Sequence, residues 1–555
     1  MTQKLILYIY TFLLLVFSDG IFGQKINLKI TSKDSIENRF LQIFNYQKKH
    51  ATREELHTEI RTFSNQLKKA GYFTNSYTVL SEKDTLFLAQ FTLGAKTKNA
   101  VIKLPSDFKI QHPKINIHKN IVSIPIEELA NFLTEITRDL EKKGKSFSEV
   151  QLTNIRTKKN TLLADVRINQ SKKRTINRII IKGYEDFSQS HIKYYLKIKK
   201  EAAFNQQQLK NISSAIKPLN FVSEIKPPEV LFSKDSTLLY IYLKKEKINS
   251  FDGLLNFTSK KNGKGLLLNG HINLKLVNLL HQGEEFELYW NRINNESQEL
   301  KLLTKIPYFL GSKFSPEISF HIFKQDSTFT STDFKSLVSY NINNKTSIAF
   351  TYTAKNSKDL LQNNTNNTIA TFSNYFIGMQ FTYRLQKDDA FNNDKFFISV
   401  NPSFGKRNSN EIQTSQFKID IESTFIWELN TRNSIFIRNK TGFLNSDTYL
   451  ENEIYRIGGF NSIRGFNEQS VLTQQYSFFN TEYRYITSAT SYLYSITDFG
   501  TVKTTISSNL LGIGAGYHFK IRKTHINLGY VVSKTSISNF NFNNSKFLLK
   551  IVNYF

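Results

Sequence analysis

YRIGGFNSIRGF, residues 455–466, is the most specific pattern in this sequence. It joins a pair of glycines to an arginine-centred turn: Gly458, Gly459, Arg464, Gly465 and Phe466. Paired glycines allow backbone angles that other residues avoid. The guanidinium of Arg464 is permanently charged, so it needs carboxylate or carbonyl partners if it is enclosed. An isolated triplet of this kind is usually a solvated hairpin loop, but this one lies between two β-rich regions, a few strands before Phe555 ends the chain.

Apolar and polar residues alternate on both sides of this stretch, from about residue 249 to the end of the chain. In the stretch 417–422, for example, Phe, Ile and Ile alternate with Lys, Asp and Glu. A period of two with charges on one face is typical of a membrane β-barrel, which must close because backbone groups in lipid have to be paired. A soluble sandwich with one wet face is the alternative.

Sixteen candidate strands fit this pattern, an even number as single-chain barrels prefer. They begin near residues 254, 265, 284, 298, 314, 333, 346, 373, 395, 416, 434, 476, 491, 510, 525 and 546. The arginine loop then falls between the eleventh and twelfth strands. The first strand, 254–259, is short and flanked by glycines, which predicts a weakly paired seam between the first and last strands.

The strands that follow the loop carry the polar residues of interest. In the segment 479–485, Asn480, Glu482 and Arg484 share one face and aromatic residues the other. In the segment 511–517, glycines alternate with larger residues. Gly512, Gly514 and Gly516 would face the lumen and leave a trough in which another backbone can approach.

The first half of the chain has a mixed α and β pattern that recurs about every 75 residues, which we interpret as a small domain present three times. Apolar residues at helical spacing form a stripe at 56–67 and another at 129–140, and each stripe is followed by a glycine and two strand-like runs. We predict a signal peptide and four domains: 1–23, 24–98, 99–173, 174–247 and the barrel at 248–555.

The N-terminus predicts export. Lys4 precedes an apolar core, 5–17, and small residues near Gly23 offer a cleavage site. The core is too short to span a membrane comfortably, and no later segment has eighteen consecutive apolar residues. We therefore expect an exported protein that crosses a membrane, if at all, as a barrel.

The composition narrows the class of protein further. Hydrophobic residues are 40% and mean hydropathy is −0.37, which excludes a helical membrane protein, while the aromatic content of 14% suits two-faced strands. Cysteine is absent, so disulfides, thiol metal sites and a lipidated N-terminal cysteine are excluded. The net charge of +28 could indicate nucleic acid or an anionic membrane. Because no compact basic motif or zinc spacing accompanies it, we expect no nucleic-acid partner.

The loop and the strands after it resemble the BamA/TamA-like outer-membrane assembly factors, which combine POTRA domains with a sixteen-stranded barrel. The segment 495–502 looks like the Asp-x-Gly-Thr-Val strand of this family, with Asp498 and Gly500 at its key positions. The third repeat resembles a POTRA domain in residues 179–183, Phe204, Leu209 and 238–243, although Ala203 stands where the family usually has glycine.

The resemblance implies that the loop folds into the barrel and that Arg464 pairs there with Asp498, Glu482 or both, beside Gly500 and the glycine trough. A buried pair of this kind fixes conformation more reliably than it adds stability. Phe555 would end a C-terminal recognition strand that serves assembly. The carboxylates have a structural partner in Arg464, and catalytic or metal-binding motifs such as H-E-x-x-H and G-x-S-x-G are absent from the sequence, so we expect neither an enzyme nor a cofactor.

The function that the resemblance implies is insertion or translocation of polypeptides in the bacterial outer membrane, with the N-terminal domains in the periplasm. Expected partners are unfolded outer-membrane or secreted polypeptides, lipid, and accessory periplasmic or lipoprotein subunits. A secretion pore for a dedicated substrate is the alternative, and it would require the loop to leave the barrel. A diffusion porin is a further alternative, but a porin would not need three exported domains.

Overall fold

The computed structural model describes residues 26–83, 86–106, 117–118, 120–259, 266–293, 297–361, 368–387, 391, 394–504 and 506–555. The predicted signal peptide therefore lies outside the described residues. The chain divides into two compact units, one running through Thr175 with Ala203–Gln206 and the other containing Ile176–Ala202 with Gln207–Phe555. None of the helices in the described ranges is long and apolar enough to cross a membrane.

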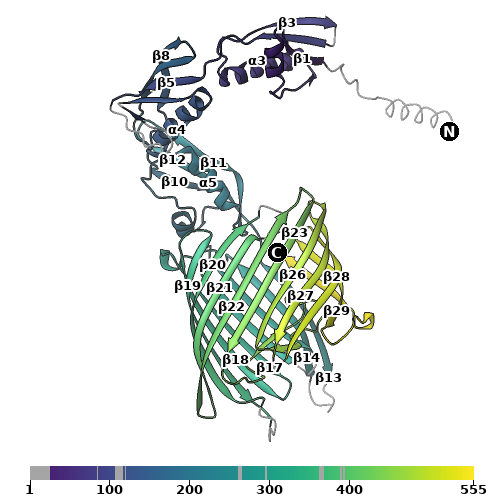
Figure 1. The fold of residues 1–555 in the computed structure, drawn as a ribbon. Coiled ribbons are helices and arrows are strands. Elements are labelled where there is room, and N and C mark those ends of the chain that lie inside the picture. Colours follow the sequence, from purple (N-terminus) through teal and green to yellow (C-terminus); the bar gives the residue numbers. More distant parts are fainter. Residues whose placement is uncertain are drawn as a thin grey trace, which may run out of the picture. The chain divides into compact units, whose positions relative to one another are not determined.

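The first domain is a four-stranded sheet covered by two helices (Figure 1). Its elements are β1 (Ile26–Ser32), α2 (Ser35–Leu41), β2 (Lys49–His50), α3 (Arg53–Lys69), β3 (Ser76–Lys83) and β4 (Leu86–Thr92). The sheet order is β2-β1-β4-β3, with β1 parallel to β4. The stripe at Leu56, Ile60, Phe63 and Leu67 is buried, as its spacing predicts, and packs α3 on the sheet. The sequence analysis did not foresee β1 and α2.

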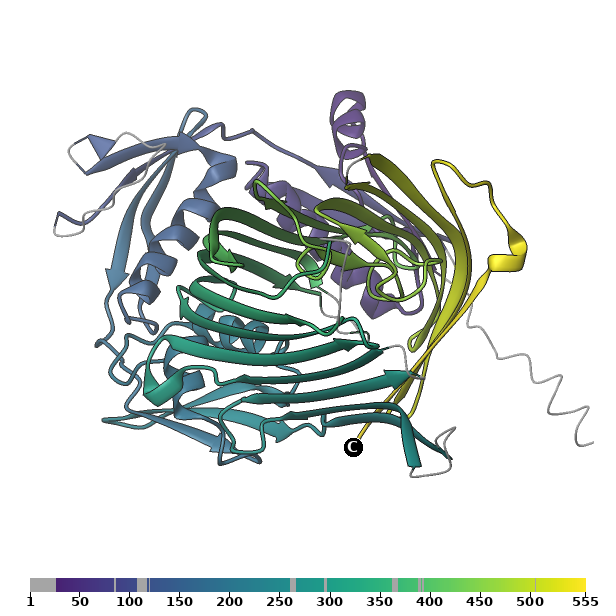
Figure 2. The same ribbon diagram turned by 90° about the horizontal axis from the view of Figure 1, so that it is seen from below.

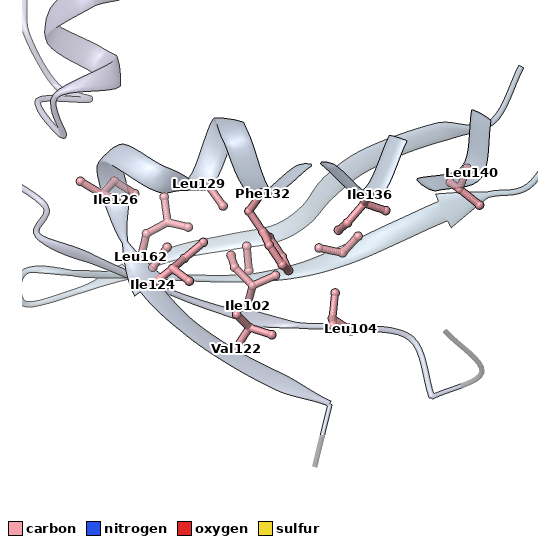
Figure 3. Packing of buried hydrophobic residues seen from close by; sticks show 13 residues of the cluster. Ile102, Leu104, Val122, Ile124, Ile126, Leu129, Phe132, Ile136, Leu140 and Leu162 are labelled. Atoms are coloured by element: carbon pink, nitrogen blue, oxygen red, sulfur yellow. The ribbon is translucent and has the colours of Figure 1, made fainter. Parts of the chain in front are cut away.

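The second domain has the same βαββ end but a different beginning. Its elements are β5 (Asn99–Lys103), β6 (Ile117–His118), β7 (Ile121–Pro125), α4 (Leu129–Lys142), β8 (Glu149–Lys158) and β9 (Thr161–Asn169), in the sheet order β6-β7-β5-β9-β8. β7 pairs with β5 as β2 pairs with β1, so β6 stands in the chain where the first domain has α2. Phe132 and Ile136 of α4 point into a core formed with Ile102 and Val122 (Figure 3).

The third domain belongs to the same compact unit as the barrel. It contains β10 (Arg178–Lys182), the π-helical turn η2 (His191–Tyr195), α5 (Gln206–Ile216), β11 (Val222–Phe232) and β12 (Thr237–Lys245). The sheet order is β10-β12-β11, with β10 parallel to β12. This β-α-α-β-β succession follows the predicted elements of the third repeat closely.

The rest of the chain forms a closed barrel of sixteen strands in sequence order (Figures 1 and 2), which confirms the predicted fold class and strand number. The strands are β13 (Ser250–Ser259), β14 (Leu266–Val277), β15 (Glu285–Ile293), β16 (Ser297–Lys305), β17 (Phe314–Gln325), β18 (Phe329–Asn341), β19 (Thr346–Asp359), β20 (Phe372–Gln386), β21 (Asp394–Ser409), β22 (Ile412–Glu428), β23 (Asn433–Asn445), β26 (Gln475–Ser488), β27 (Ser491–Lys503), β28 (Ser507–Ile521), β29 (Thr524–Thr535) and β30 (Lys546–Tyr554). The arginine loop lies between the eleventh and twelfth strands, β23 and β26.

The alternation along β26 explains why a barrel forms. Phe479 and Tyr483 are exposed on the outer face, whereas Asn480, Glu482 and Arg484 are buried on the inner face. An outward apolar face beside an inward polar one is the pattern of a transmembrane barrel. The period of two in the sequence is therefore the lipid-facing and lumen-facing alternation.

The seam that closes the barrel is narrow. β13 pairs with β14 over ten residue pairs, but with β30 over only two, Ser250 with Tyr554 and Phe251 with Asn553. The expectation of a short first strand is wrong, because β13 has ten residues rather than the six of 254–259. The weak closure comes instead from the small overlap between β13 and β30.

The core of the second domain generates the first prediction. Phe132→Ala in a fragment covering residues 24–247 should destabilise that domain by about 3–5 kcal/mol, because a buried aromatic side chain leaves a cavity when it is truncated. Chemical denaturation followed by circular dichroism measures the change. Asn131→Ala, one position away on the exposed face of α4, is the matched control and should change stability by less than about 0.5 kcal/mol. Equal effects of the two substitutions would contradict this packing.

Candidate functional site: a loop held inside the barrel

Residues 446–474 connect β23 to β26 and fold back into the barrel, where Figure 2 shows them within the ring of strands. A short hairpin, β24 (Tyr455–Ile457) paired with β25 (Val471–Thr473), forms the base of the tip. The tip is apolar on one side, because Ile457 and Ile463 are buried against Phe478, Val502 and Leu510 of the barrel wall, with Phe466 partly buried beside them. The loop is thus packed like a core element and not solvated.

Arg464 lies at the centre of this loop and contacts both predicted carboxylates. Its Nε donates to Asp498 Oδ2 at 2.9 Å and its Nη2 to Asp498 Oδ1 at 2.7 Å, a bidentate pair. Its Nη1 donates to Glu482 Oε1 at 2.6 Å. The backbone N–H of Arg464 also donates to Asp498 Oδ2, at 2.8 Å. Arg464, Asp498 and Glu482 are 6%, 0% and 7% exposed, so all three charges are enclosed.

Arg484 completes the charge balance of this cluster. Its Nε donates to Glu482 Oε2 at 2.8 Å and its Nη2 lies 2.7 Å from the same oxygen. The Arg484 guanidinium also lies 4.0 Å from the ring centroid of Phe436. Two arginines therefore face two carboxylates, and no member of the cluster is buried without an opposite charge, which is the condition for burying charges at acceptable cost.

Two glycines are required where the loop meets the wall. A Cβ on Gly512 of β28 would lie 2.3 Å from the carbonyl oxygen of Arg464, so only glycine lets the two backbones approach. Gly465 has φ +95°, which L side chains rarely adopt, and a Cβ there would meet Ser533 Cβ at 2.7 Å. Gly500 lies beside Ile463, whose Cδ1 would be 3.1 Å from an added Cβ.

The other predicted glycines divide between the loop and its surroundings. Gly458 and Gly459 have φ of +112° and +99° and let the loop turn after β24. Gly516, by contrast, faces the ring of Tyr494, and an added Cβ on Gly514 would meet the Tyr530 carbonyl. The predicted trough therefore accepts the loop backbone at Gly512 alone, and a side chain fills the space at Gly516.

A second buried ion pair anchors the beginning of the loop, and sequence analysis missed it. Glu453 Oε2 accepts from Arg407 Nη1 of β21 at 2.5 Å, and Glu453 Oε1 accepts from Gln416 Nε2 of β22 at 2.6 Å. Arg407 Nη2 donates to Thr448 Oγ1 at 2.5 Å. Glu453 lies in no local sequence motif, and its partner Arg407 is 46 positions away. The only sequence signal for the pair is the alternation along β21, which places Arg407 on the inner face.

Polar contacts also bind the loop to other parts of the barrel. Asn452 Nδ2 donates to Ser357 Oγ and to the Ala370 carbonyl, both at 2.8 Å. On the far side of the tip, Arg438 Nη2 donates to the Asn461 carbonyl at 3.1 Å. Gln469 Nε2 lies 3.4 Å from Glu299 Oε2 of β16. The loop therefore contacts strands around much of the barrel circumference.

The third domain is docked on two turns of the barrel. Tyr184 Oη lies 2.7 Å from His281 Nδ1 and accepts from Asn278 Nδ2 at 3.0 Å. The ring of His191 packs edge-on against Tyr308, with centroids 5.0 Å apart. His281 and Asn278 belong to the turn after β14, and Tyr308 to the turn after β16. These contacts fix the domain next to the first strands of the barrel.

The chain end lies at the seam. The backbone N–H of Phe555 donates to the carbonyl oxygen of Asn249 at 2.8 Å, which extends the short ladder between β13 and β30 by one bond. The Phe555 side chain is about half exposed. Within the described residues, no group of three or more His, Cys, Asp or Glu side chains could hold a metal ion.

Three α+β domains, followed by a closed sixteen-stranded barrel that encloses an arginine loop, have the architecture of a POTRA-barrel protein. Among solved structures, CdiB from Acinetobacter baumannii is similar over 83% of this chain and 90% of that chain, with 15% identity and a TM-score of 0.51. CdiB from Escherichia coli is similar over 89% and 98%, with 12% identity and a TM-score of 0.50. BamA from Haemophilus ducreyi lacking POTRA domains 1–3 matches over 77% and 93%, with 13% identity and a TM-score of 0.45.

At these identities the likeness to CdiB establishes the fold, and it agrees with the fold that the loop sequence predicted. No family model matches the sequence, and no curated protein matches it. The likeness to known proteins therefore lies in the architecture.

The arginine cluster generates the second prediction. Arg464→Ala leaves the Asp498 carboxylate buried with one charge partner fewer. Breaking a fully buried ion pair destabilises the folded state by on the order of 3–5 kcal/mol, and by less if water enters. The loop should then detach, and protease should cut between residues 446 and 474 while the barrel stays folded. Arg464→Lys should rescue poorly, because lysine lacks the planar fork that contacts Asp498 twice. Limited proteolysis of the membrane-inserted protein measures loop release.

Arg456→Ala is the matched control for this prediction, because Arg456 lies in the same loop but packs over the rings of Phe323 and Phe329. It should leave the loop largely protected. Equal protection of the loop in wild type and Arg464→Ala would show that the cluster does not hold it.

Proposed function

We propose that this protein is an outer-membrane factor that inserts or translocates polypeptides and uses the narrow seam to do so. The observation that carries the proposal is the closure of the barrel by two residue pairs, Ser250 with Tyr554 and Phe251 with Asn553. Neighbouring strands elsewhere pair over many more residues; β29 and β30, for example, share eight pairs. The seam is therefore the place where the barrel opens at the lowest cost in backbone hydrogen bonds.

An open seam offers what an incoming strand needs. Beyond Phe251, the remaining residues of β13 pair with β14 but have no register partner on β30, so the backbone groups on that edge are available to a new strand. In lipid each unpaired backbone N–H or C=O group costs several kcal/mol, and this cost is about the same for a group on the open seam as for one on the client strand. Pairing the two relieves both costs, so burial of the client in the bilayer drives the reaction without a nucleotide.

The held loop favours the seam over the lumen as the route. The arginine cluster and the Glu453–Arg407 pair hold the loop at two separate places on the wall. A polypeptide that passed through the lumen would have to break both sets of buried charges. The secretion pore is the second candidate, and it requires this larger rearrangement.

Location and partners follow from the same proposal. The barrel lies in the bacterial outer membrane, and the three N-terminal domains lie in the periplasm. The clients are unfolded outer-membrane or secreted polypeptides that meet these domains first, together with accessory periplasmic or lipoprotein subunits. The sheet edges of such domains can add an extended chain by backbone pairing. No step in this function requires a catalytic residue or a cofactor.

Locking the seam is the experiment that tests the proposed function. The chain has no cysteine, so the double variant Ser250→Cys and Tyr554→Cys creates a single possible disulfide across the seam. In cells that depend on this variant, oxidation should abolish assembly of outer-membrane proteins almost completely, and a reductant should restore it. Quantitative proteomics of the outer membrane and of the secreted fraction provides the measurement.

Thr382→Cys with Ser399→Cys is the matched control, because these residues are partners across β20 and β21, away from the seam. Oxidation of this control should leave assembly unchanged. Loss of a secreted protein alone, with normal outer-membrane assembly, would favour the secretion pore. Normal levels of both fractions with the seam locked would rule out a lateral route.

The end of the chain generates a further prediction. Deletion of Phe555 removes the hydrogen bond to Asn249 from a seam that has few others, so a smaller fraction of the protein should reach the closed, inserted form. The heat-modifiable fraction in semi-native electrophoresis measures it. Phe542→Ala, which removes an exposed phenylalanine from the loop before β30, should have no effect. Unchanged insertion after the deletion would contradict a role for Phe555.

A further inference from the structure

A cleft of about 830 Å³ lies between the third domain and the barrel, within the compact unit that both share. One wall comes from η2 and α5, with residues from His191 to Ala215. The other wall comes from the ends of β16 to β20, with residues from Lys305 to Gln386. The contacts of Tyr184 and Tyr308 hold the third domain on the turns after β14 and β16. The cleft is the space that these contacts leave open over the ends of the neighbouring strands.

The cleft opens onto the lumen side of these strands. Ser339 and Asn341 line it, and both share a face of β18 with the buried Leu337. Arg384 likewise shares the inner face of β20 with Asn374, which contacts the loop residue Glu453. A ligand in the cleft would therefore lie at the entrance of the barrel interior and not on its lipid-facing surface.

The floor of the cleft is apolar. Leu196, Ile198, Ile212 and Phe221 are all buried and contribute to its lining. His191 lies among them, and its Nδ1 is a buried atom without a hydrogen-bond partner in the described part of the chain. Burial lowers the pKa of His191 to about 4, so the ring is uncharged at neutral pH. An uncharged imidazole can accept or donate one hydrogen bond to a polar group that enters.

The rim of the cleft is positively charged. Its described lining contains four cationic side chains, all exposed, and no Asp or Glu: Lys197, Lys305, Lys345 and Arg384. Lys305 and Arg384 each have a carboxylate on an adjacent strand, at 3.8 Å and 3.4 Å. Lys197 and Lys345, on opposite walls, form no ion pair within the described residues. These two charges are therefore free to meet a ligand.

We propose that this cleft binds a short extended segment of the client in which acidic side chains alternate with apolar ones. The apolar floor takes the apolar side chains, and Lys197 and Lys345 bind the carboxylates from the two walls. The position at the lumen entrance favours a polypeptide over an anionic lipid, whose headgroups lie outside the ring of strands. The inference rests on the proposed function and adds the chemistry of the segment that is recognised.

Peptide binding to the full-length protein in nanodiscs tests the proposal. The probes are three fluorescein-labelled twelve-residue peptides in which Val and Phe alternate with Asp, Asn or Lys. Fluorescence anisotropy should rank their affinities in the order Asp, Asn, Lys, and the affinity of the Asp peptide should fall as salt is raised. Equal affinity of the Asp and Lys peptides would overturn the proposal.

Charge reversal locates the binding site. The double variant Lys197→Glu and Lys345→Glu should weaken binding of the Asp peptide by about tenfold. Lys210→Glu with Lys313→Glu is the matched control: Lys210 lies on α5 and Lys313 directly before β17, both outside the cleft lining, and binding should stay the same. Heat-modifiability checks that all variants are folded. Equal binding by the cleft variant and wild type overturns the proposal.

Photo-crosslinking distinguishes this inference from the proposed function. A photoreactive residue at Asn343, which lines the cleft, should crosslink the Asp peptide, whereas one at Phe404, exposed on the outer face of β21, should not. If anionic vesicles displace the Asp peptide from Asn343, the site recognises lipid and the proposal is wrong. The cleft could bind the peptide while locking the seam changes neither the outer-membrane proteins nor the secreted proteins. In that case the proposed function fails and this inference stands.

Discussion

The enclosed charge of Arg464 constrains the strands that surround it. A guanidinium that leaves water without partners costs far more than a loop can recover by packing, so carboxylates must point inward where it arrives. Asp498 and Glu482 meet this need from adjacent strands, and Arg484 balances the second of them. The inward faces of β26 and β27 are thus fixed by one side chain of the loop.

The same constraint explains the second anchor. A loop held at Arg464 alone could pivot, because its beginning would be joined to the wall only by chain connectivity. The Glu453–Arg407 pair and the amide of Gln416 attach that beginning to β21 and β22. Held at two places, the loop is attached to β21 and β22 at its beginning and to β26 and β27 at Arg464.

Sequence reasoning recovered what is local and missed what is distant. The approximate starts of most barrel strands, the position of the loop and the inward face of β26 follow from a period of two, because every residue of a two-faced strand contributes to that pattern. The contact of Arg464 with Asp498, Glu482 or both was predicted, but the way the two carboxylates share the guanidinium depends on strand register and was not. The Glu453–Arg407 pair joins segments 46 residues apart and leaves no local trace. The hairpin β6–β7 was missed for a similar reason, since tertiary context decides whether so short a segment becomes strand or helix.

The place where the third domain docks connects these features. Its contacts with Asn278, His281 and Tyr308 lie on the turns after β14 and β16, which are close in the ladder to β13, the first strand of the seam. Residues 246–249 alone join β12 to β13. Under the proposed function, a client released from the third domain would therefore have only a few strands to cross before it met the edge of β13 that faces the seam. Docking beside the seam would then set the order of events by distance, with capture at the domain first and pairing with β13 second.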